Sequence, residues 1–245
     1  MLCVERCHLS VAGFVAAPYA SALSAVSDEE ARLGVTCIDM GSGTTSFAVF
    51  ADGNFAYCDA IAMGGNHITL DLARSLSTPL EEAERIKTLH GCAFAAASDE
   101  NEIISFPLVG EHQPSQLNQA SKAQIAQLVQ QRIEEILELT RDRLDAAGLG
   151  DMAGQHIVLT GGASQLAGVC DYTARMFSKV VRIGSPKHLS GLPEHGVGPA
   201  FATATGILQY VLREPGEFSP SAETQMLATG TGYISRVGQW IRESF

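Results

Sequence analysis

The segment from Val35 to Thr45 constrains the fold more than any other part of this 245-residue chain. A run of β-branched and apolar residues delivers one carboxylate, Asp39, and stops at a turn rich in glycine, serine and threonine. An extended pattern resumes at residues 46–50, so the sequence predicts a strand, a hairpin turn and a second strand. Glycines let backbone N–H groups approach an anion, and threonine hydroxyls add donors. The pattern fits a phosphate-binding loop and an ordinary hairpin turn about equally well.

Asp39 lies where its strand ends, and a carboxylate there is suited to hold Mg²⁺ through water, because Mg²⁺ sheds its hydration shell reluctantly. The turn is not a Walker loop, since no Gly-Lys-Ser/Thr follows it. It is not a Rossmann fingerprint either, since a strand rather than a helix follows. The residues expected around a phosphate are Gly41, Ser42, Gly43, Thr44 and Thr45.

Composition excludes several classes of function. The formal net charge of −11 argues against a nucleic-acid surface, which requires a basic patch. The six cysteines include no CxxC pair and the seven histidines no HExxH motif, so no zinc site is expected. No apolar run is long enough for a membrane-spanning helix. Scattered cysteines without a signal peptide indicate a reducing, cytosolic compartment.

Strands and helices alternate along the chain. Strands are expected at residues 11–16, 35–39, 46–50, 55–61, 102–106, 156–160 and 180–183. Helices are expected to end near residue 25 and to cover residues 68–76, 78–91, 121–147, 166–177 and 199–212. Thr78 is placed as the N-cap of its helix with Pro79 in the first turn, and residues 28–34 are expected to form a polar connection. This alternation predicts an α/β architecture with some parallel pairing.

A second glycine turn follows the strand at residues 156–160. Thr160-Gly161-Gly162-Ala163 repeats the design of the first loop, but here a helix follows. The glycines would let a flat ring lie against the backbone, and the alternative is a simple βα turn. Two strands thus end in glycine loops, with a mostly helical insertion between them.

The two loops together resemble the nucleotide site of the superfamily of actin, hexokinase and the heat-shock chaperones. Residues 39–44 look like its second phosphate loop and residues 160–163 like its adenosine loop. Over essentially its whole length the chain resembles more closely the FtsA family of bacterial actin-like cell-division proteins, most specifically at Ile-Lys-Thr-Leu-His-Gly-Cys-Ala, residues 86–93. Ser42 departs from the family's usual third glycine. The resembling stretches are residues 38–45, 65–71, 83–93, 158–165 and 182–186.

The resemblance implies an actin-like (ribonuclease-H-like) ATPase lobe of α/β class with a mostly helical insertion subdomain, and ATP with Mg²⁺ as its cofactors. It implies that Asp39 positions the Mg²⁺ and that the turn from Gly41 to Thr45 contacts the β- and γ-phosphates. Adenosine would be flanked by Gly161, Gly162 and Ala163. No catalytic residue is assigned.

Glu84 and Lys87 resemble the family's ribose and adenine contacts. They lie three residues apart and therefore share one helix face. The alternative interpretation is a solvated ion pair, which this spacing produces often.

The superfamily's first phosphate loop is not found in this sequence, so we expect the whole N-terminal lobe to be absent. We therefore expect weak or no ATP binding and no hydrolysis by this chain alone. The expected domains are an inner actin-like subdomain (1–63 and 155–212), an outer insertion subdomain (64–154), a flexible linker (213–231) and a terminal amphipathic helix (232–245).

The terminal helix carries a second strong signal. Its apolar stripe comprises Tyr233, Ile234, Val237, Trp240, Ile241 and Phe245. Arg236 and Arg242 lie on the other side, and tryptophan with arginine suits the headgroup boundary of an anionic membrane. The alternative is a helix docked on its own core, but a long polar linker favours the membrane. The family resemblance points to the same membrane-targeting helix.

Two functions follow from the resemblance and the terminal helix. The first is an adaptor that polymerises with itself and links the FtsZ C-terminal tail to anionic lipids and other division proteins, at the cytoplasmic face of the inner membrane. The FtsZ tail is expected on the outer subdomain. The second is an ATPase or sugar-kinase-like enzyme, which would need a catalytic aspartate in the absent lobe and no membrane helix. The terminal helix favours the adaptor, and hydrolysis stays uncertain.

Overall fold

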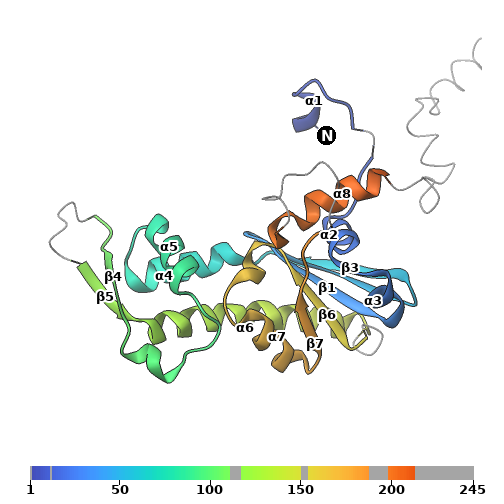
Figure 1. Cartoon of the computed structure of the whole chain (residues 1–245). Helices are drawn as coiled ribbons and strands as arrows, with labels where there is room; N and C mark the ends of the chain where they lie inside the picture. The colour runs from blue at the N-terminus through green and yellow to red at the C-terminus, as the bar shows by residue number, and fades with distance from the viewer. Residues whose placement is uncertain (1, 12, 111–116, 150–153, 188–197, 213–245) are drawn as a thin grey trace, which may run out of the picture. The chain divides into compact units, whose positions relative to one another are not determined.

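The computed structural model describes residues 2–11, 13–110, 117–149, 154–187 and 198–212. Residues 1–210 belong to one compact unit, and a second unit begins at Val211, of which only Val211 and Leu212 are described. The centre of the first unit is a five-stranded sheet with the order β3-β2-β1-β6-β7 (Figure 1). Its strands are β1 (Val35–Met40), β2 (Thr45–Ala51), β3 (Asn54–Ile61), β6 (His156–Thr160) and β7 (Val180–Ile183).

Strand directions place the loops of interest. β1 pairs antiparallel with β2, and β2 with β3, which makes a meander through the first glycine turn. β1 pairs in parallel with β6, and β6 with β7. The predicted α/β class with some parallel pairing is therefore present.

Side chains alternate between the two faces of the sheet. On β1, Val35 and Cys37 face the helix α2 (Ala17–Ala25), whereas Ile38 and Met40 face the opposite core. The long helix α6 (Lys122–Ala146) contributes Ile133, Ile136 and other fully buried residues to that opposite core. Figure 1 shows α2 and α6 on opposite sides of the sheet.

The segment between β3 and β6 includes the longest described helix, α6, and a second, two-stranded sheet. It contains α4 (Gly65–Leu76), α5 (Leu80–His90), the 3₁₀ helix η1 (Ala97–Glu100), the hairpin β4 (Ile103–Pro107) with β5 (Leu117–Ser121), and α6. Its apolar residues share one core with the sheet. Arg132 of α6 holds α4 through two bonds to Asp71, at 2.6 and 3.0 Å. After β6 come η2 (Gly162–Gln165), α7 (Val169–Phe177), η4 (Pro199–Phe201) and α8 (Ala202–Leu212); α1 (Leu2–Glu5) precedes the unit's core.

The polar connection predicted at residues 28–34 is wrong, because the helix α3 (Asp28–Leu33) lies there. Ser27 and Glu30 cap its first turn reciprocally, and Gly34 ends it with φ of 88°. The Ser-x-x-Glu spacing was a usable signal for this helix.

Other predicted boundaries also need correction. The strand expected at residues 11–16 is wrong: Val11 and residues 13–16 lie outside the sheet, and Phe14 is 76% exposed. Thr78 does not cap α5, because its hydroxyl donates to the carbonyl of Pro107 and the helix begins at Leu80. The helix expected from residue 166 begins at Val169, after η2.

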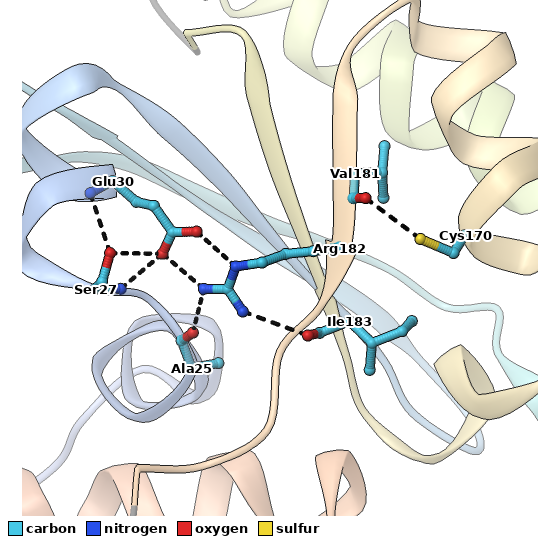
Figure 2. Close-up of polar contacts among 7 residues, drawn as sticks. All are labelled: Ala25, Ser27, Glu30, Cys170, Val181, Arg182 and Ile183. Carbon is cyan, nitrogen blue, oxygen red and sulfur yellow. Dashed lines mark hydrogen bonds and ion pairs between the residues drawn. The ribbon is translucent and has the colours of Figure 1, made fainter.

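Arg182 fastens the edge strand β7 to α2 and α3 (Figure 2). Its Nε and Nη2 donate to the two carboxylate oxygens of Glu30 at 2.5 and 2.6 Å, and Nη2 also donates to the carbonyl of Ala25 at 2.9 Å. This bidentate contact, with the bonds from Ser27, lowers the pKa of Glu30 to about 2. β7 is therefore held from the side as well as through its pairing with β6.

Candidate functional site

The two glycine loops leave the same edge of the sheet. β1 and β6 are parallel neighbours, and Asp39 lies opposite Thr160 in their register. Since parallel strands end at one edge, the loop after β1 and the loop after β6 begin side by side, where ligands bind in many open α/β sheets. The structure thus brings together the two loops that the sequence analysis paired.

The first loop is closed on itself and held by α4. The N–H of Gly41 donates to the carbonyl of Thr44 at 2.9 Å. The N–H groups of Gly65 and Asn66 donate to the carbonyls of Gly41 and Ser42 at 2.9 and 2.8 Å. Two free N–H groups of the first turn of α4 are thereby satisfied by the loop, which fixes the loop's position.

The tip of the first loop is open. Ser42, Gly43 and Thr44 are exposed, and a Cβ added to Gly43 would meet nothing within 4 Å. Thr45 differs, because it starts β2 and is fully buried on the Met40 side of the sheet. Its hydroxyl has no hydrogen-bond partner among the described residues and is closed to a ligand. Of the predicted phosphate contacts, Thr45 is the one whose side chain is not presented.

The Asp39 carboxylate is held on one side by two hydroxyl groups. Its Oδ2 accepts bonds from the hydroxyls of Ser21 on α2 and Thr203 on α8, at 2.5 and 2.9 Å. Its Oδ1 faces Gly161, where an added Cβ would collide with it. Gly161 also has φ of 84°, so glycine is required there for space and for backbone conformation.

The second loop is anchored through Thr160 and Gly161. The Thr160 hydroxyl donates to the carbonyl of Gly184 at 2.9 Å or to that of Pro199 at 3.2 Å. The N–H of Gly161 donates to the carbonyl of Pro199 at 3.1 Å. A Cβ at Gly162 would meet only the methyl of Ala200, at 3.9 Å. The loop is therefore held from behind while Gly162 keeps free space in front.

Glu84 and Lys87 reach the site through Gly65. A Cβ on Gly65 would lie 3.1 Å from the Ala163 methyl and 3.8 Å from Nζ of Lys87. Nζ of Lys87 donates to the Gly65 carbonyl at 3.2 Å and to the Thr69 hydroxyl at 2.9 Å, and pairs with Glu84 at 2.6 Å. The first loop, the second loop and α5 therefore meet around Gly65.

The Glu84–Lys87 pair is not a simple solvated pair. The Lys87 side chain is 12% exposed, whereas that of Glu84 is 51% exposed. Partial burial raises the pKa of Glu84, but hydrogen bonds from Lys87 and Thr69 outweigh it and leave the pKa below its usual range. Lys87 thus joins α4 to α5, while the Glu84 carboxylate stays accessible.

Several residues of this site were not predicted. Ser21, Thr203 and Pro199 lie far from Asp39 in sequence, and no local pattern marks them. Gly65 and Thr69 fall in a stretch that was matched to the family but assigned no role. The glycine pair Gly64-Gly65, three residues beyond the end of β3, is the one sequence signal of a close backbone contact here.

The donors present fit a hydrated Mg²⁺ rather than a directly ligated transition metal. Among the described residues no three His, Cys, Asp or Glu side chains gather into a metal-binding group. Asp39 supplies one carboxylate beside an exposed glycine turn, and Mg²⁺ is commonly held by one or two carboxylates, waters and substrate phosphates. The residues therefore fit a magnesium–phosphate group.

The predicted linker and terminal amphipathic helix, residues 213–231 and 232–245, lie outside the described residues. Every helix that the structure does describe is too short or too polar to cross a bilayer. The division of residues 1–212 into inner and outer subdomains stays a prediction.

Comparison with known sequences gives a consistent result. The family model "Cell division protein FtsA" matches residues 36–206. The cell division protein FtsA of Agrobacterium fabrum is 48% identical over 100% of the chain, and that of Escherichia coli K12 is 34% identical over 99%. The chain spans only 56% and 59% of the length of these two relatives.

Solved structures share the fold. MreB5 of Spiroplasma citri bound to ADP aligns with a TM-score of 0.65 at 19% identity, covering 84% of this chain and 61% of that one. The PilM–PilN type IV pilus biogenesis complex aligns with a TM-score of 0.60 at 17% identity, covering 84% of this chain and 54% of that one. These likenesses show an actin-like α/β fold.

Proposed function

Because this chain belongs to the FtsA family of cell-division proteins, we propose that it acts as an actin-like adaptor of the division machinery. The observation that carries the proposal is the 48% identity to an FtsA over the whole chain. The adaptor would associate with itself and bind the C-terminal tail of FtsZ and other division proteins. It would work at the cytoplasmic face of the inner membrane at the division site.

We propose that the site at the sheet edge binds ATP with Mg²⁺. Asp39 would hold the hydrated Mg²⁺ through Oδ1, and backbone N–H groups at the tip of the first loop, residues 42–44, would contact the phosphates. The adenosine would lie against Gly161, Gly162 and Ala163, with Glu84 and Lys87 beside it. The accessible Glu84 carboxylate, the open space at Gly43 and Gly162, and the ADP bound in the structurally similar MreB5 support this assignment.

Isothermal titration with Mg-ATP tests the site. We expect a Kd of about 0.1 mM or weaker, because the proposed contacts are few: one carboxylate, two glycine loops and the Glu84–Lys87 pair. D39N should abolish the Mg²⁺ dependence. E82Q, which changes the α5 partner of Arg85, serves as control and should bind as wild type does. Micromolar affinity would contradict the expected weak binding, and unchanged Mg²⁺-dependent binding by D39N would contradict the assignment.

The membrane contact is proposed for the terminal helix. Its apolar stripe with Trp240 and Ile241 would enter the headgroup boundary, and Arg236 and Arg242 would add about 1 kcal/mol each at an anionic surface. This makes a weak and reversible anchor, which self-association would strengthen through avidity.

Co-sedimentation with anionic vesicles tests the anchor. We expect the wild-type chain to bind anionic vesicles and not neutral ones, and W240D/I241D to stay in the supernatant. Q239D adds one acidic residue on the polar side of the same helix and should retain most binding. Equal co-sedimentation of W240D/I241D and wild type would exclude the helix as the anchor.

A further inference from the structure

The back of the Asp39 carboxylate is built from two helices that are far apart in sequence. Ser21 belongs to α2 and is fully buried, and Thr203 belongs to the first turn of α8. Both hydroxyls lie within hydrogen-bond distance of the same oxygen, Oδ2, and within 2.7 Å of each other. Three polar groups from α2, α8 and β1 therefore meet at one point.

The protons of this cluster have a preferred acceptor. Each hydroxyl carries one proton, and Ser21 also lies 3.0 Å from the carbonyl of Ala17. An ionised carboxylate accepts stronger hydrogen bonds than a carbonyl or a hydroxyl does. Oδ2 of Asp39 is therefore the preferred acceptor, and the second hydroxyl, 2.7 Å from the first, is the alternative acceptor for one of the two protons. Oδ1 is left facing Gly161.

α8 rests on α2 through small residues around this cluster. Ser24 donates to the carbonyl of Ala202 at 2.8 Å. A Cβ at Gly206 would collide with the carbonyl of Ala20, so the two helices approach as closely as glycine permits. A displacement of α8 would therefore pull the Thr203 hydroxyl away from Asp39.

We propose that Ser21 and Thr203 are positioning residues for Asp39, and that Thr203 links occupancy of the carboxylate to the seating of α8 on α2. The link rests on the proposed Mg-nucleotide site. Hydroxyls that hold the carboxylate in its binding orientation favour the bound cation. By thermodynamic reciprocity a bound cation then favours the orientation that keeps α8 seated.

Hydrogen exchange of the full chain, without ligand, tests the positioning. T203V removes the hydroxyl at nearly constant shape, and S21A removes the other one. We expect amide exchange in residues 206–210 of α8 to rise about tenfold in each variant, because a bond to a charged acceptor is lost. T203S should behave as wild type. T173V is the matched control, since Thr173 is a buried threonine that donates within α7 to Val169, and it should leave α8 unchanged.

Binding of Mg-ADP and of ADP with EDTA, measured by ligand-observed NMR, tests the link. T203V should weaken Mg-ADP binding about tenfold and leave metal-free ADP unchanged, since the lost bond acts through the metal-binding carboxylate. Mg-ADP should slow α8 exchange in wild type and not in T203V.

The inference would be overturned if amide exchange of α8 in T203V and S21A were as slow as in wild type, or if it were as fast in T203S as in T203V. It would also be overturned if T203V weakened the binding of Mg-ADP and of metal-free ADP equally. If the wild-type chain binds no nucleotide, the proposed nucleotide site fails and the link falls with it. The exchange of the free proteins then still decides whether Ser21 and Thr203 position Asp39.

Discussion

At the scale of single residues, Gly161 is the site glycine whose replacement is restricted by both space and backbone conformation. It combines φ of 84° with a lack of space, because an added Cβ would collide with Oδ1 of Asp39. Gly43, in the companion loop, has negative φ and empty space around it. The two glycines look alike in sequence, yet one is needed to build the site and the other leaves room in it.

This difference predicts opposite outcomes for two alanine substitutions. G161A should lower the free energy of unfolding by about 2 kcal/mol or more, because it adds both left-handed backbone strain and a collision. G43A should stay within about 0.5 kcal/mol of wild type. Urea unfolding followed by circular dichroism measures both. Equal stability of the two variants would show that Asp39 and Gly161 are not in contact.

Residues that belong to a local sequence motif could be predicted as parts of the site, whereas residues that reach the site only through tertiary packing could not. Asp39, Gly161 and Lys87 stand in recognisable patterns, and the structure places all of them around one edge of the sheet. Ser21 and Thr203 stand in ordinary helices, and only tertiary packing moves their hydroxyls to Asp39. No local sequence pattern contains that information.

At the scale of elements, Arg182 connects β7 to the consecutive helices α2 and α3, from whose bonded residues it is separated by 157 and 152 positions in sequence. The guanidinium of Arg182, on β7, donates hydrogen bonds to the Glu30 carboxylate in the first turn of α3 and to the carbonyl of Ala25 at the end of α2. The Arg182 side chain is 42% exposed and that of Glu30 18%, so solvent screens part of the attraction.

Loss of this connection should be measurable and pH-dependent. R182Q should lower the free energy of unfolding at pH 7 by about 1–2 kcal/mol, after allowance for solvent screening. The folded-state pKa of Glu30, about 2, lies below the ordinary value of 4.5, so the stabilisation is present above pH 4.5 and is lost as pH falls toward 2. The difference between R182Q and wild type should therefore shrink on acidification.

The control is R85Q, which removes an i, i+3 partner of Glu82 from the surface of α5. Denaturant unfolding at a series of pH values follows all three proteins. A gap between R182Q and wild type that stays constant down to pH 3 would mean that Glu30 does not carry the effect.

A helix or strand could be predicted from the sequence where the periodicity of its apolar residues and the residues that mark its ends indicated the same element. β1, β6 and α6 satisfy both, and the structure has them close to the expected bounds. β5 was missed because its residues are mostly polar and exposed, and only pairing with β4 makes it a strand. Residues 11–16 have the composition of a strand but lie outside the sheet.

At the scale of the whole molecule, the chain has an actin-like fold and covers 56% of an FtsA that it matches at 48% identity. The site at Asp39 and the proposed membrane helix lie in different units of the chain. In the adaptor proposal the terminal helix would contact lipid, and the folded unit would contact FtsZ and further copies of the chain. Membership of the FtsA family supports a role in cell division.

Recruitment of FtsZ to a supported anionic bilayer tests the adaptor proposal most directly. Fluorescent FtsZ is added with the full chain, with the W240D/I241D variant, or with an FtsZ that lacks its C-terminal tail. We expect membrane fluorescence only when the wild-type chain and the intact FtsZ tail are both present. FtsZ that remains in solution above a bilayer coated with the wild-type chain would contradict it.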